Sequence, residues 1–118
     1  MTAAKDNPDG VVQKVRRQSG VIILDLAGDV DLHCATGLRS RLIEIMNEKP
    51  PLAVINLSRV DFMDSSGLAT LIEALQLSRR FGGQLRLAGI RERVRSIFEI
   101  ARLDTIFQIF NTEAEALA

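Results

Sequence analysis

The strongest constraint on the fold is that short apolar runs alternate along the chain with segments of helical periodicity. Residues 52–57, LAVINL, are too few and too continuously apolar for a surface helix, so we expect a buried strand there. Further along, apolar residues recur at the i, i+3, i+4, i+7 spacing of a one-sided helix, at Leu68, Leu71, Ile72 and Leu75. Buried strands that alternate with amphipathic helices are typical of α/β proteins.

The whole chain, interpreted in this way, predicts the order β-β-α-β-α-β-α-β-α. Helices then cover a mixed, mainly parallel sheet of about five strands, with about four α-helices in all. The turn Gln18-Ser19-Gly20 between the first two strands predicts an antiparallel N-terminal hairpin. We expect a loop at 29–33, strands at 11–17, 21–28, 52–57, 84–90 and 105–110, and helices at 34–48, from about 65 to Gly82-Gly83, at 91–101 and at 111–118.

The length of 118 residues fits one domain, which we expect to span residues 11–118. Residues 1–10 contain Asn7-Pro8 and Asp9-Gly10 and predict a disordered lead-in with no signal-peptide core. No apolar run approaches the roughly 18 residues of a membrane span. The single cysteine, Cys34, rules out an internal disulfide and favours a reducing cytoplasm.

Composition argues against several classes of function. Fifteen basic and fifteen acidic residues give zero net charge, and Trp and Tyr are absent, which disfavours nucleic-acid binding. Neither a Walker phosphate loop nor a Gly-x-Gly-x-x-Gly motif occurs, so no cofactor is expected. One cysteine and one histidine are too few for a metal site built on those residues. An oxygen-only cation site is conceivable, but no EF-hand spacing occurs among Asp29, Asp31, Asp61 and Asp64.

The segment VDFMDSSGLATLIEAL (60–75) places a cluster of polar residues at the start of a predicted helix. The plain interpretation is a helix cap, since Asp or Ser at that position stabilises a helix by about 1 kcal/mol. One capping residue would suffice, however, and Gly67 in the first turn costs up to about 1 kcal/mol relative to Ala. A glycine at that place indicates that another group approaches the backbone closely.

A catalytic serine is a second interpretation of the same segment. A nucleophile elbow needs Gly-x-Ser-x-Gly, and Met63 occupies the place of the first glycine. A general base is also needed, and His33 is the only histidine in the chain. His33 is expected in a loop near the first helix and leaves this option open, although we do not expect an enzyme.

A third interpretation makes the serine a phosphate acceptor. A phosphoryl group at a helix N-terminus faces free N–H groups and the positive end of the helix dipole, so the fold tolerates it. The same group adds nearly two negative charges to an exposed position beside Asp64. A partner docked there meets repulsion while the scaffold stays intact, which is the behaviour of a binding switch.

These residues resemble those of the STAS-domain family, specifically its anti-sigma factor antagonists. VINLSRVDFMDSSGLATLI (54–72) is similar to the most diagnostic segment of that family, and Asp64-Ser65-Ser66-Gly67-Leu68 matches its phosphorylation motif without a gap. LDLAGDVDLHCATGLRSRL (24–42) is similar to a second signature, in which a Gly-acidic-x-Asp loop precedes the first helix. The resemblance spans about residues 11–117.

The resemblance implies a STAS fold and a partner-switching mechanism. An unphosphorylated antagonist binds an anti-sigma factor that is also an ATP-dependent serine kinase, and the sigma factor is released. The kinase then phosphorylates the serine directly after the motif's aspartate, here Ser65, and a separate serine phosphatase reverses the modification. The implied docking surface comprises Asp31, Met63, Asp64, Ser66 and Gly67.

Several alternatives stay open at this point. Ser66 is the other hydroxyl that a kinase could modify. A STAS accessory subunit of a membrane transport assembly, of the lipid-transport ABC type, needs no phosphoswitch, and the intact Asp-Ser-Ser-Gly favours the antagonist over it. A monomer or weak homodimer is expected. If the sheet brings their loops together, we also expect Asp25, Asp29, Asp31, Asp61 and Asp64 to form an acidic edge near Ser65, whereas the arginines of the third helix lie well away in sequence. For Asp25 the alternative is burial and pairing within the sheet.

Overall fold

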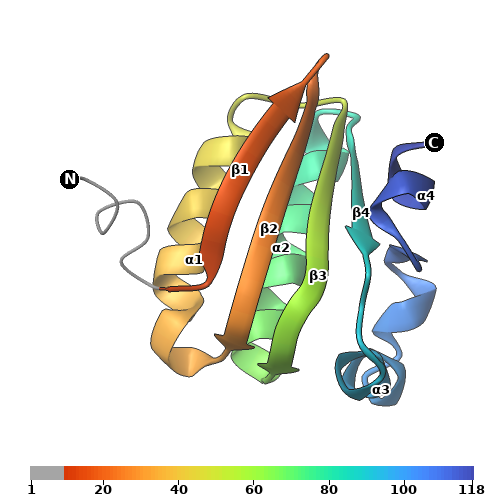
Figure 1. Ribbon diagram of the computed structural model, residues 1–118. Coiled ribbons are helices and arrows are strands. Elements are labelled where there is room, and N and C mark those ends of the chain that lie inside the picture. The colour runs from red at the N-terminus through yellow and green to blue at the C-terminus, as the bar shows by residue number, and fades with distance from the viewer. Residues whose placement is uncertain (1–9) are drawn as a thin grey trace.

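The structure, a computed structural model, describes residues 10–118. The lead-in expected at residues 1–10 therefore lies outside the described residues, apart from Gly10. The elements follow the predicted order (Figure 1). The strands are β1 (Val12–Gln18), β2 (Val21–Val30), β3 (Leu52–Met63), β4 (Gln84–Ala88) and β5 (Gln108–Phe110), and the helices are α1 (Leu32–Met46), α2 (Ser65–Arg80), α3 (Glu92–Ile100) and α4 (Glu113–Leu117).

The five strands form one mixed sheet in the order β1-β2-β3-β4-β5. β1 and β2 are antiparallel, and the remaining neighbours pair in parallel. The predicted hairpin turns at Ser19 and Gly20, both of which have positive φ angles. The sequence-based fold class, a mainly parallel sheet with an N-terminal antiparallel hairpin and four helices, is confirmed.

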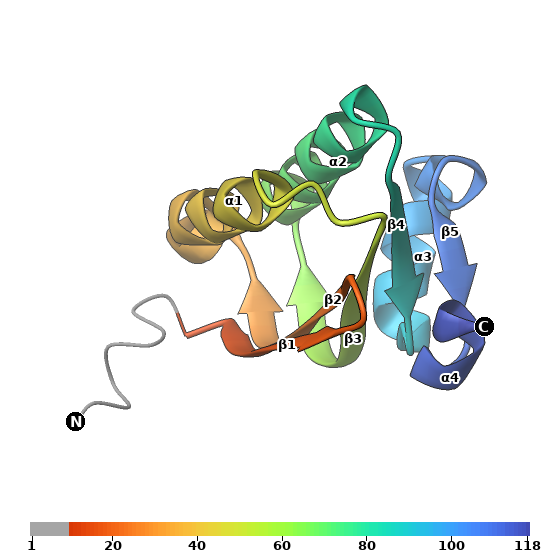
Figure 2. The same cartoon turned by 90° about the horizontal axis from the view of Figure 1, so that it is seen from above.

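The helices cover the two faces of the sheet unequally. Figure 2 shows α1 and α2 side by side on one face, with α4 on the other. The main core lies under α1 and α2, and Val94 and Phe98 bring α3 into the same cluster. A smaller cluster beneath α4 joins Ile23, Val54 and Ala116. Among residues 10–118 no helix combines the length and the apolar composition that crossing a membrane requires.

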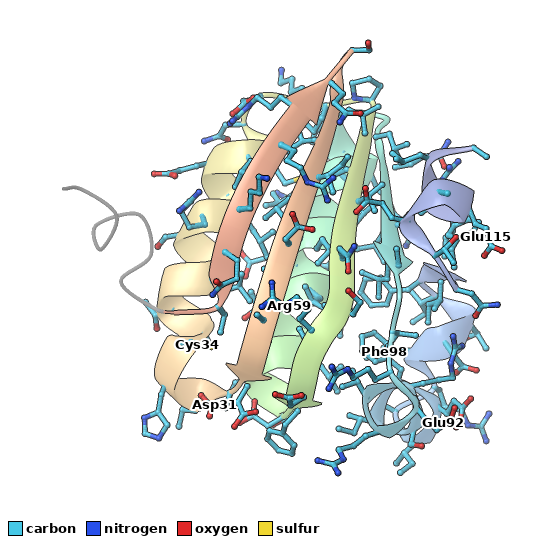
Figure 3. The ribbon with its side chains drawn as sticks, in the orientation of Figure 1. Asp31, Cys34, Arg59, Glu92, Phe98 and Glu115 are labelled. Carbon is cyan, nitrogen blue, oxygen red and sulfur yellow. The ribbon has the colours of Figure 1, made fainter. Side chains whose placement is uncertain are left out.

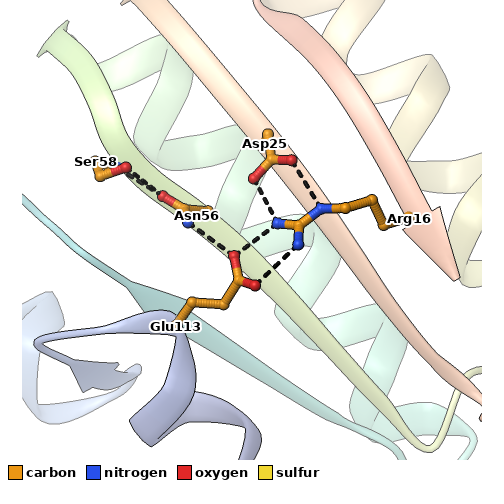
Figure 4. A network of polar contacts seen from close by, with 5 residues as sticks. All are labelled: Arg16, Asp25, Asn56, Ser58 and Glu113. Atoms are coloured by element: carbon orange, nitrogen blue, oxygen red, sulfur yellow. Dashed lines mark hydrogen bonds and ion pairs between the residues drawn. The ribbon is translucent and has the colours of Figure 1, made fainter. Parts of the chain in front are cut away.

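A polar network fixes α4 to the second face of the sheet (Figure 4). The Arg16 guanidinium donates to both carboxylate oxygens of Asp25 and to both of Glu113. The Asn56 amide also donates to Glu113, at 2.9 Å. These hydrogen bonds, first of all that from Arg16, lower the pKa of the Glu113 carboxyl despite its partial burial. The network links β1, β2 and β3 to the start of α4.

The structure corrects several predicted boundaries. β2 continues through residues 29–30, which were expected in a loop, and α1 begins at Leu32 rather than at residue 34. β3 runs to Met63, six residues beyond the predicted end of the strand at 57, because residues 59–63 pair with β2. The strand expected at 105–110 is only Gln108–Phe110, since a 3₁₀ turn occupies Leu103–Thr105. Local apolar patterning does not report such pairing between distant segments.

Candidate functional site

The site predicted around Ser65 lies at the edge of the sheet where β2 and β3 end and α1 and α2 begin (Figure 1). β2 and β3 stay paired as far as Val30 and Met63, whereas the pairing of β3 with β4 ends at Asn56 and Ala88. The β2–β3 pair therefore projects beyond the rest of the sheet, and two helices start at its tip. Such carboxyl ends of parallel strands are where α/β proteins usually place their binding sites.

The Asp64 carboxylate accepts hydrogen bonds from the first backbone N–H groups of both α1 and α2. Its Oδ1 atom accepts hydrogen bonds from the backbone N–H groups of Ser66 at 2.9 Å and Gly67 at 3.1 Å, which caps α2. Its Oδ2 atom accepts the N–H of Leu32, the first residue of α1, at 3.1 Å. The Asp64 N–H in turn donates to the Val30 carbonyl at 3.2 Å. The predicted cap is thus confirmed, and the same side chain also joins the two helix N-termini.

Gly67 is buried where α2 passes over the end of β2. A Cβ atom on Gly67 would lie 2.6 Å from the Val30 carbonyl oxygen and 2.8 Å from Cγ of Met63. The close approach expected at this glycine is therefore made by the chain itself. Met63, expected in the docking surface, is 1% exposed. Met63 and Gly67 support the site from beneath, and both residues are buried.

The two hydroxyls of the motif differ in accessibility. Ser65 is the first residue of α2; its side chain is exposed and makes no hydrogen bond within residues 10–118. Ser66 is half-buried, its N–H donates to Asp64, and its carbonyl accepts the Thr70 hydroxyl at 2.9 Å. A macromolecule that approaches this edge therefore meets the Ser65 hydroxyl more readily than that of Ser66.

Asp31 occupies at the start of α1 the N-cap position that Asp64 occupies at the start of α2. It is the N-cap of α1, and its Oδ1 atom accepts the His33 N–H at 3.0 Å. Figure 3 shows Asp31 at the tip of β2, at the same end of the molecule as the start of α2. The structure thus brings Asp31 and Asp64, which are distant in sequence, to two adjacent helix N-termini.

The expected acidic edge is only partly formed. Asp25 lies on the opposite face of the sheet, where it pairs with Arg16 at 2.8 Å. Asp61 pairs with Arg91, whose guanidinium also donates to the Ser58 carbonyl. The start of α3 therefore brings an arginine close to this edge, although the arginines of α3 are well away from it in sequence. The carboxylates of three other aspartates have no ion pair among the described residues. These are Asp29, Asp31 and Asp64.

The alternative chemistries find little support in this geometry. His33 is exposed in the first turn of α1, and no hydrogen bond joins its imidazole to Ser65 in the described part of the chain. Within residues 10–118, no group of three or more His, Cys, Asp and Glu side chains is arranged to hold a metal ion. What the edge offers is an exposed hydroxyl beside carboxylates.

Sequence reasoning missed two contacts at this site. The hydrogen bond from Leu32 to Asp64 joins residues 32 positions apart, and the ion pair of Arg91 with Asp61 joins residues 30 apart. Neither contact has a signal in local spacing, because each depends on the extension of the β2–β3 pair. The predicted β-α-β order gives one indication from sequence, because the ends of parallel strands meet at the same edge of the sheet.

Comparison with known proteins agrees with this architecture. The profile of the STAS domain matches residues 13–116. The anti-sigma-B factor antagonist of Bacillus subtilis is 30% identical over 95 residues, which cover 80% of this chain and 86% of that protein. The anti-sigma-F factor antagonist RsfB of Mycobacterium tuberculosis is 32% identical over 113 residues, which cover 93% of this chain and 89% of that protein.

The fold also matches a solved relative. The crystal structure of an anti-sigma factor antagonist from Mycobacterium paratuberculosis superposes with a TM-score of 0.83 at 26% identity, covering 93% of each chain. Family profile, sequence identity and fold agree over nearly the whole chain. The chain belongs to the STAS-domain family, among its anti-sigma factor antagonists.

Proposed function

We propose that this chain is an anti-sigma factor antagonist of the partner-switching type. In its unphosphorylated form it binds an anti-sigma factor that is also a serine kinase, and the sigma factor is released. Phosphorylation of Ser65 ends the binding, and a separate serine phosphatase restores it. The observation that carries the proposal is the exposure of Ser65 at the first turn of α2, because a kinase must reach the hydroxyl that it modifies.

The charge at the edge explains how one phosphate acts as a switch. Asp31 and Asp64 cap the two helices that start at this edge, Asp64 directly precedes Ser65, and neither carboxylate has an ion pair among the described residues. A phosphoserine adds about 1.5–2 further negative charges at pH 7. A partner whose basic groups match the unmodified surface then meets added bulk and a strongly hydrated dianion in the contact area. Binding is lost through local electrostatics and desolvation.

The scaffold is expected to survive the same modification. A phosphate on Ser65 lies beside the first N–H groups of α2, where the helix dipole favours negative charge. The side chain of Ser65 makes no hydrogen bond within the described residues that the phosphate would break. The core beneath, which includes Met63 and Gly67, is not reached by the new group. The switch thus changes the surface and leaves the fold in place.

In this proposal the chain is a ligand and a substrate, and it supplies no catalysis. The docking surface contains Asp31, Asp64 and Ser66, while Met63 and Gly67 shape it from below. The exchange takes place in the cytoplasm, where ATP and the sigma factor are available. An accessory subunit of a membrane transport assembly, by contrast, would need no reaction at Ser65.

The direct test is incubation with ATP and the purified anti-sigma factor kinases of the source organism, followed by intact-mass measurement. One added phosphate is expected in the wild type, none in Ser65→Ala, and one in Ser66→Ala. Phosphate retained by Ser65→Ala and lost by Ser66→Ala would move the site to Ser66. Absence of any phosphate with every kinase would contradict the proposed switch and favour the accessory role.

A second measurement separates the charge from the loss of the hydroxyl. Calorimetry with the same kinase is expected to show weak binding by Ser65→Asp and nearly wild-type binding by Ser65→Ala. Circular dichroism of both variants is expected to match the wild type, since Ser65 is exposed. Equal binding by the two variants would show that negative charge at this position is not the switch.

A further inference from the structure

Two large exposed apolar residues belong to elements that begin or end at the edge where α2 starts with Ser65. Within residues 10–118 only four large hydrophobic residues are exposed: Leu32 at 70%, Phe62 at 42%, Ile100 at 83% and Ile106 at 44%. Leu32 and Phe62 belong to the edge that carries Ser65, whereas Ile100 ends α3 and Ile106 follows the 3₁₀ turn. Isolated exposed hydrophobic residues are common on protein surfaces, but apolar groups placed together at a functional edge indicate an interaction site.

The contacts that build the edge fix the backbone from which both side chains extend. Leu32 is the first residue of α1, and its N–H donates to Oδ2 of Asp64 at 3.1 Å. Phe62 lies opposite Asp29 in the extended β2–β3 ladder and precedes Asp64 by two residues. Leu32 is thus joined to Asp64 by a hydrogen bond, and Phe62 lies two residues before Asp64 in the chain. Asp64 directly precedes Ser65. A rigid backbone lowers the entropy lost when such side chains are ordered on binding.

Residues 10–118 leave a large part of each side chain uncovered. The buried residues around them, Val30 and Met63, already close the core at this edge. Phe62 lies between the exposed Asp61 and the buried Met63 in β3, so its side chain lies on the sheet face opposite to that of Met63. Leu32 points away from the face of α1 that packs on the sheet, as its exposure shows. Partly exposed aromatic and aliphatic side chains are the residues from which interfaces draw much of their binding energy.

The surroundings of the two side chains specify what would cover them. Asp29 lies opposite Phe62 in the ladder, Asp31 directly precedes Leu32, and Asp64 directly precedes Ser65. None of these three carboxylates has an ion pair among the described residues. A complementary surface therefore has an apolar depression with basic side chains at its rim. From this arrangement we infer that Leu32 and Phe62 are the apolar anchors through which the anti-sigma factor recognises the unphosphorylated chain. The inference rests on the proposed function and names the residues on which partner affinity depends.

The position of the anchors also links affinity to the switch. A contact of Leu32 and Phe62 with the partner removes water from the surface next to Ser65. A phosphate on Ser65 has to keep its hydration, because burial of an unpaired charge is very costly. The phosphate and the apolar contact therefore exclude each other. Removal of the anchors is expected to weaken binding and also to reduce the further effect of charge at Ser65, since neighbouring changes are not additive.

The test compares anchor variants with matched controls elsewhere on the surface. Leu32→Gln keeps a good helix former, and Phe62→Thr keeps a residue suited to a strand. Ile106→Thr is the control for Phe62, because its exposure is nearly equal and it lies near the C-terminal end of α2, beside Ser78 and Arg79. Ile100→Gln is the control for Leu32. Thermal unfolding of each variant establishes that the fold is intact.

Calorimetric titration with the purified anti-sigma factor kinases, without ATP, gives the affinity. Each anchor variant is expected to bind at least about tenfold more weakly than the wild type, and each control to bind within about twofold of it. Anchor variants that bind like the wild type, or controls that lose as much affinity, would overturn the inference and leave the proposed function standing. A wild-type chain that binds none of the kinases would overturn both.

The coupling to the switch supplies a second readout. Ser65→Asp is introduced into the wild type and into the Leu32→Gln background, and the loss of affinity is compared. The loss is expected to be at least about threefold larger in the wild type, because only there does the charge oppose an apolar contact. Equal losses in the two backgrounds would show that the anchors and Ser65 act independently and would contradict this mechanism.

Discussion

Leu32 and Asp64, 32 residues apart, are joined by a hydrogen bond of 3.1 Å from a backbone N–H to Oδ2 of the carboxylate. The other oxygen of Asp64 caps α2, so one side chain fixes the relative placement of two helix N-termini. The exposed residues of the proposed interface, Ser65 and Leu32, are the first residues of those two helices. The geometry of the interface therefore depends on Asp64 even if no partner contacts it.

The first prediction concerns the two hydrogen-bonding functions of Asp64. Asp64→Ala is expected to lower the free energy of unfolding by about 1–2 kcal/mol, because both helices lose an acceptor. Asp64→Asn is expected to have a smaller effect, since its amide oxygen still caps α2 while its NH₂ group cannot accept the N–H of Leu32. Urea unfolding measures the stability, and hydrogen exchange at the Leu32 amide measures the second bond.

Asp29→Asn is the matched control for Asp64, because Asp29 is exposed and its side chain makes no hydrogen bond within residues 10–118. Its effect on the free energy of unfolding is expected to stay within about 0.5 kcal/mol. Unchanged exchange at Leu32 in Asp64→Asn would refute the assignment of a shared carboxylate.

The second prediction concerns the crowding around Gly67. Gly67→Ala is expected to destabilise the fold by about 1–3 kcal/mol, although alanine is the better helix former, because its Cβ would lie 2.6 Å from the Val30 carbonyl oxygen. Denaturant unfolding measures the change. Ser65→Ala in the same turn is the control and is expected to be nearly neutral. If Gly67→Ala were more stable than the wild type, the first turn of α2 would have to move enough to accommodate the added Cβ without cost.

The third prediction concerns acid stability. The hydrogen bond from Arg16 lowers the pKa of Glu113 in the folded state, so Glu113 contributes stability above its ordinary pKa of about 4.3. That contribution is lost as the pH falls through the lowered pKa, since the protonated carboxyl no longer pairs with Arg16. Glu113→Gln is expected to cost about 1–2 kcal/mol near pH 7 and less at pH 3.

Unfolding free energies measured from about pH 7 to 3 check this prediction for Glu113. Glu99→Gln is the control, because the exposed Glu99 side chain makes no hydrogen bond or ion pair in the described part of the chain. Parallel pH profiles of the wild type and Glu113→Gln would show that this carboxyl does not contribute to the acid sensitivity.

The fourth prediction concerns salt. Affinity for the anti-sigma factor is expected to fall roughly tenfold between about 0.05 and 0.5 M NaCl, because the exposed carboxylates at the edge are screened. Asp29→Asn is expected to bind more weakly at low salt and to show a shallower dependence. Titrations at four salt concentrations measure both effects. An affinity that does not change with salt concentration would contradict the proposal that basic side chains of the partner lie at the rim of its binding surface.

Much of this organisation could be predicted from local sequence. The strand at 52–57 and the helical spacing of Leu68, Leu71, Ile72 and Leu75 follow from periodicity, and the cap at Asp64 follows from residue type. The boundaries were less accurate. The extension of β3 to Met63 depends on its pairing with β2, and no local pattern in residues 58–63 reports it.

The charge distribution shows the same limit. Five aspartates near two loops suggested one acidic edge, yet Asp25 pairs with Arg16 in the middle of β2 and the β3–α3 contact pairs Asp61 with Arg91. The exposure of Leu32 and Phe62 likewise cannot be predicted, because apolar residues are ordinarily counted toward the core. Both results depend on which segments meet in space.

The sequence by itself determined the order of the elements, the helix cap at Asp64 and the presence of a serine where a helix begins, because periodicity and capping depend on residues close together in the chain. Only the tertiary structure decided that α1 and α2 start side by side, that Asp64 bonds both, and that Leu32 and Phe62 stay exposed next to Ser65. Those features follow from the parallel pairing of β2 with β3, which joins segments about 30 residues apart.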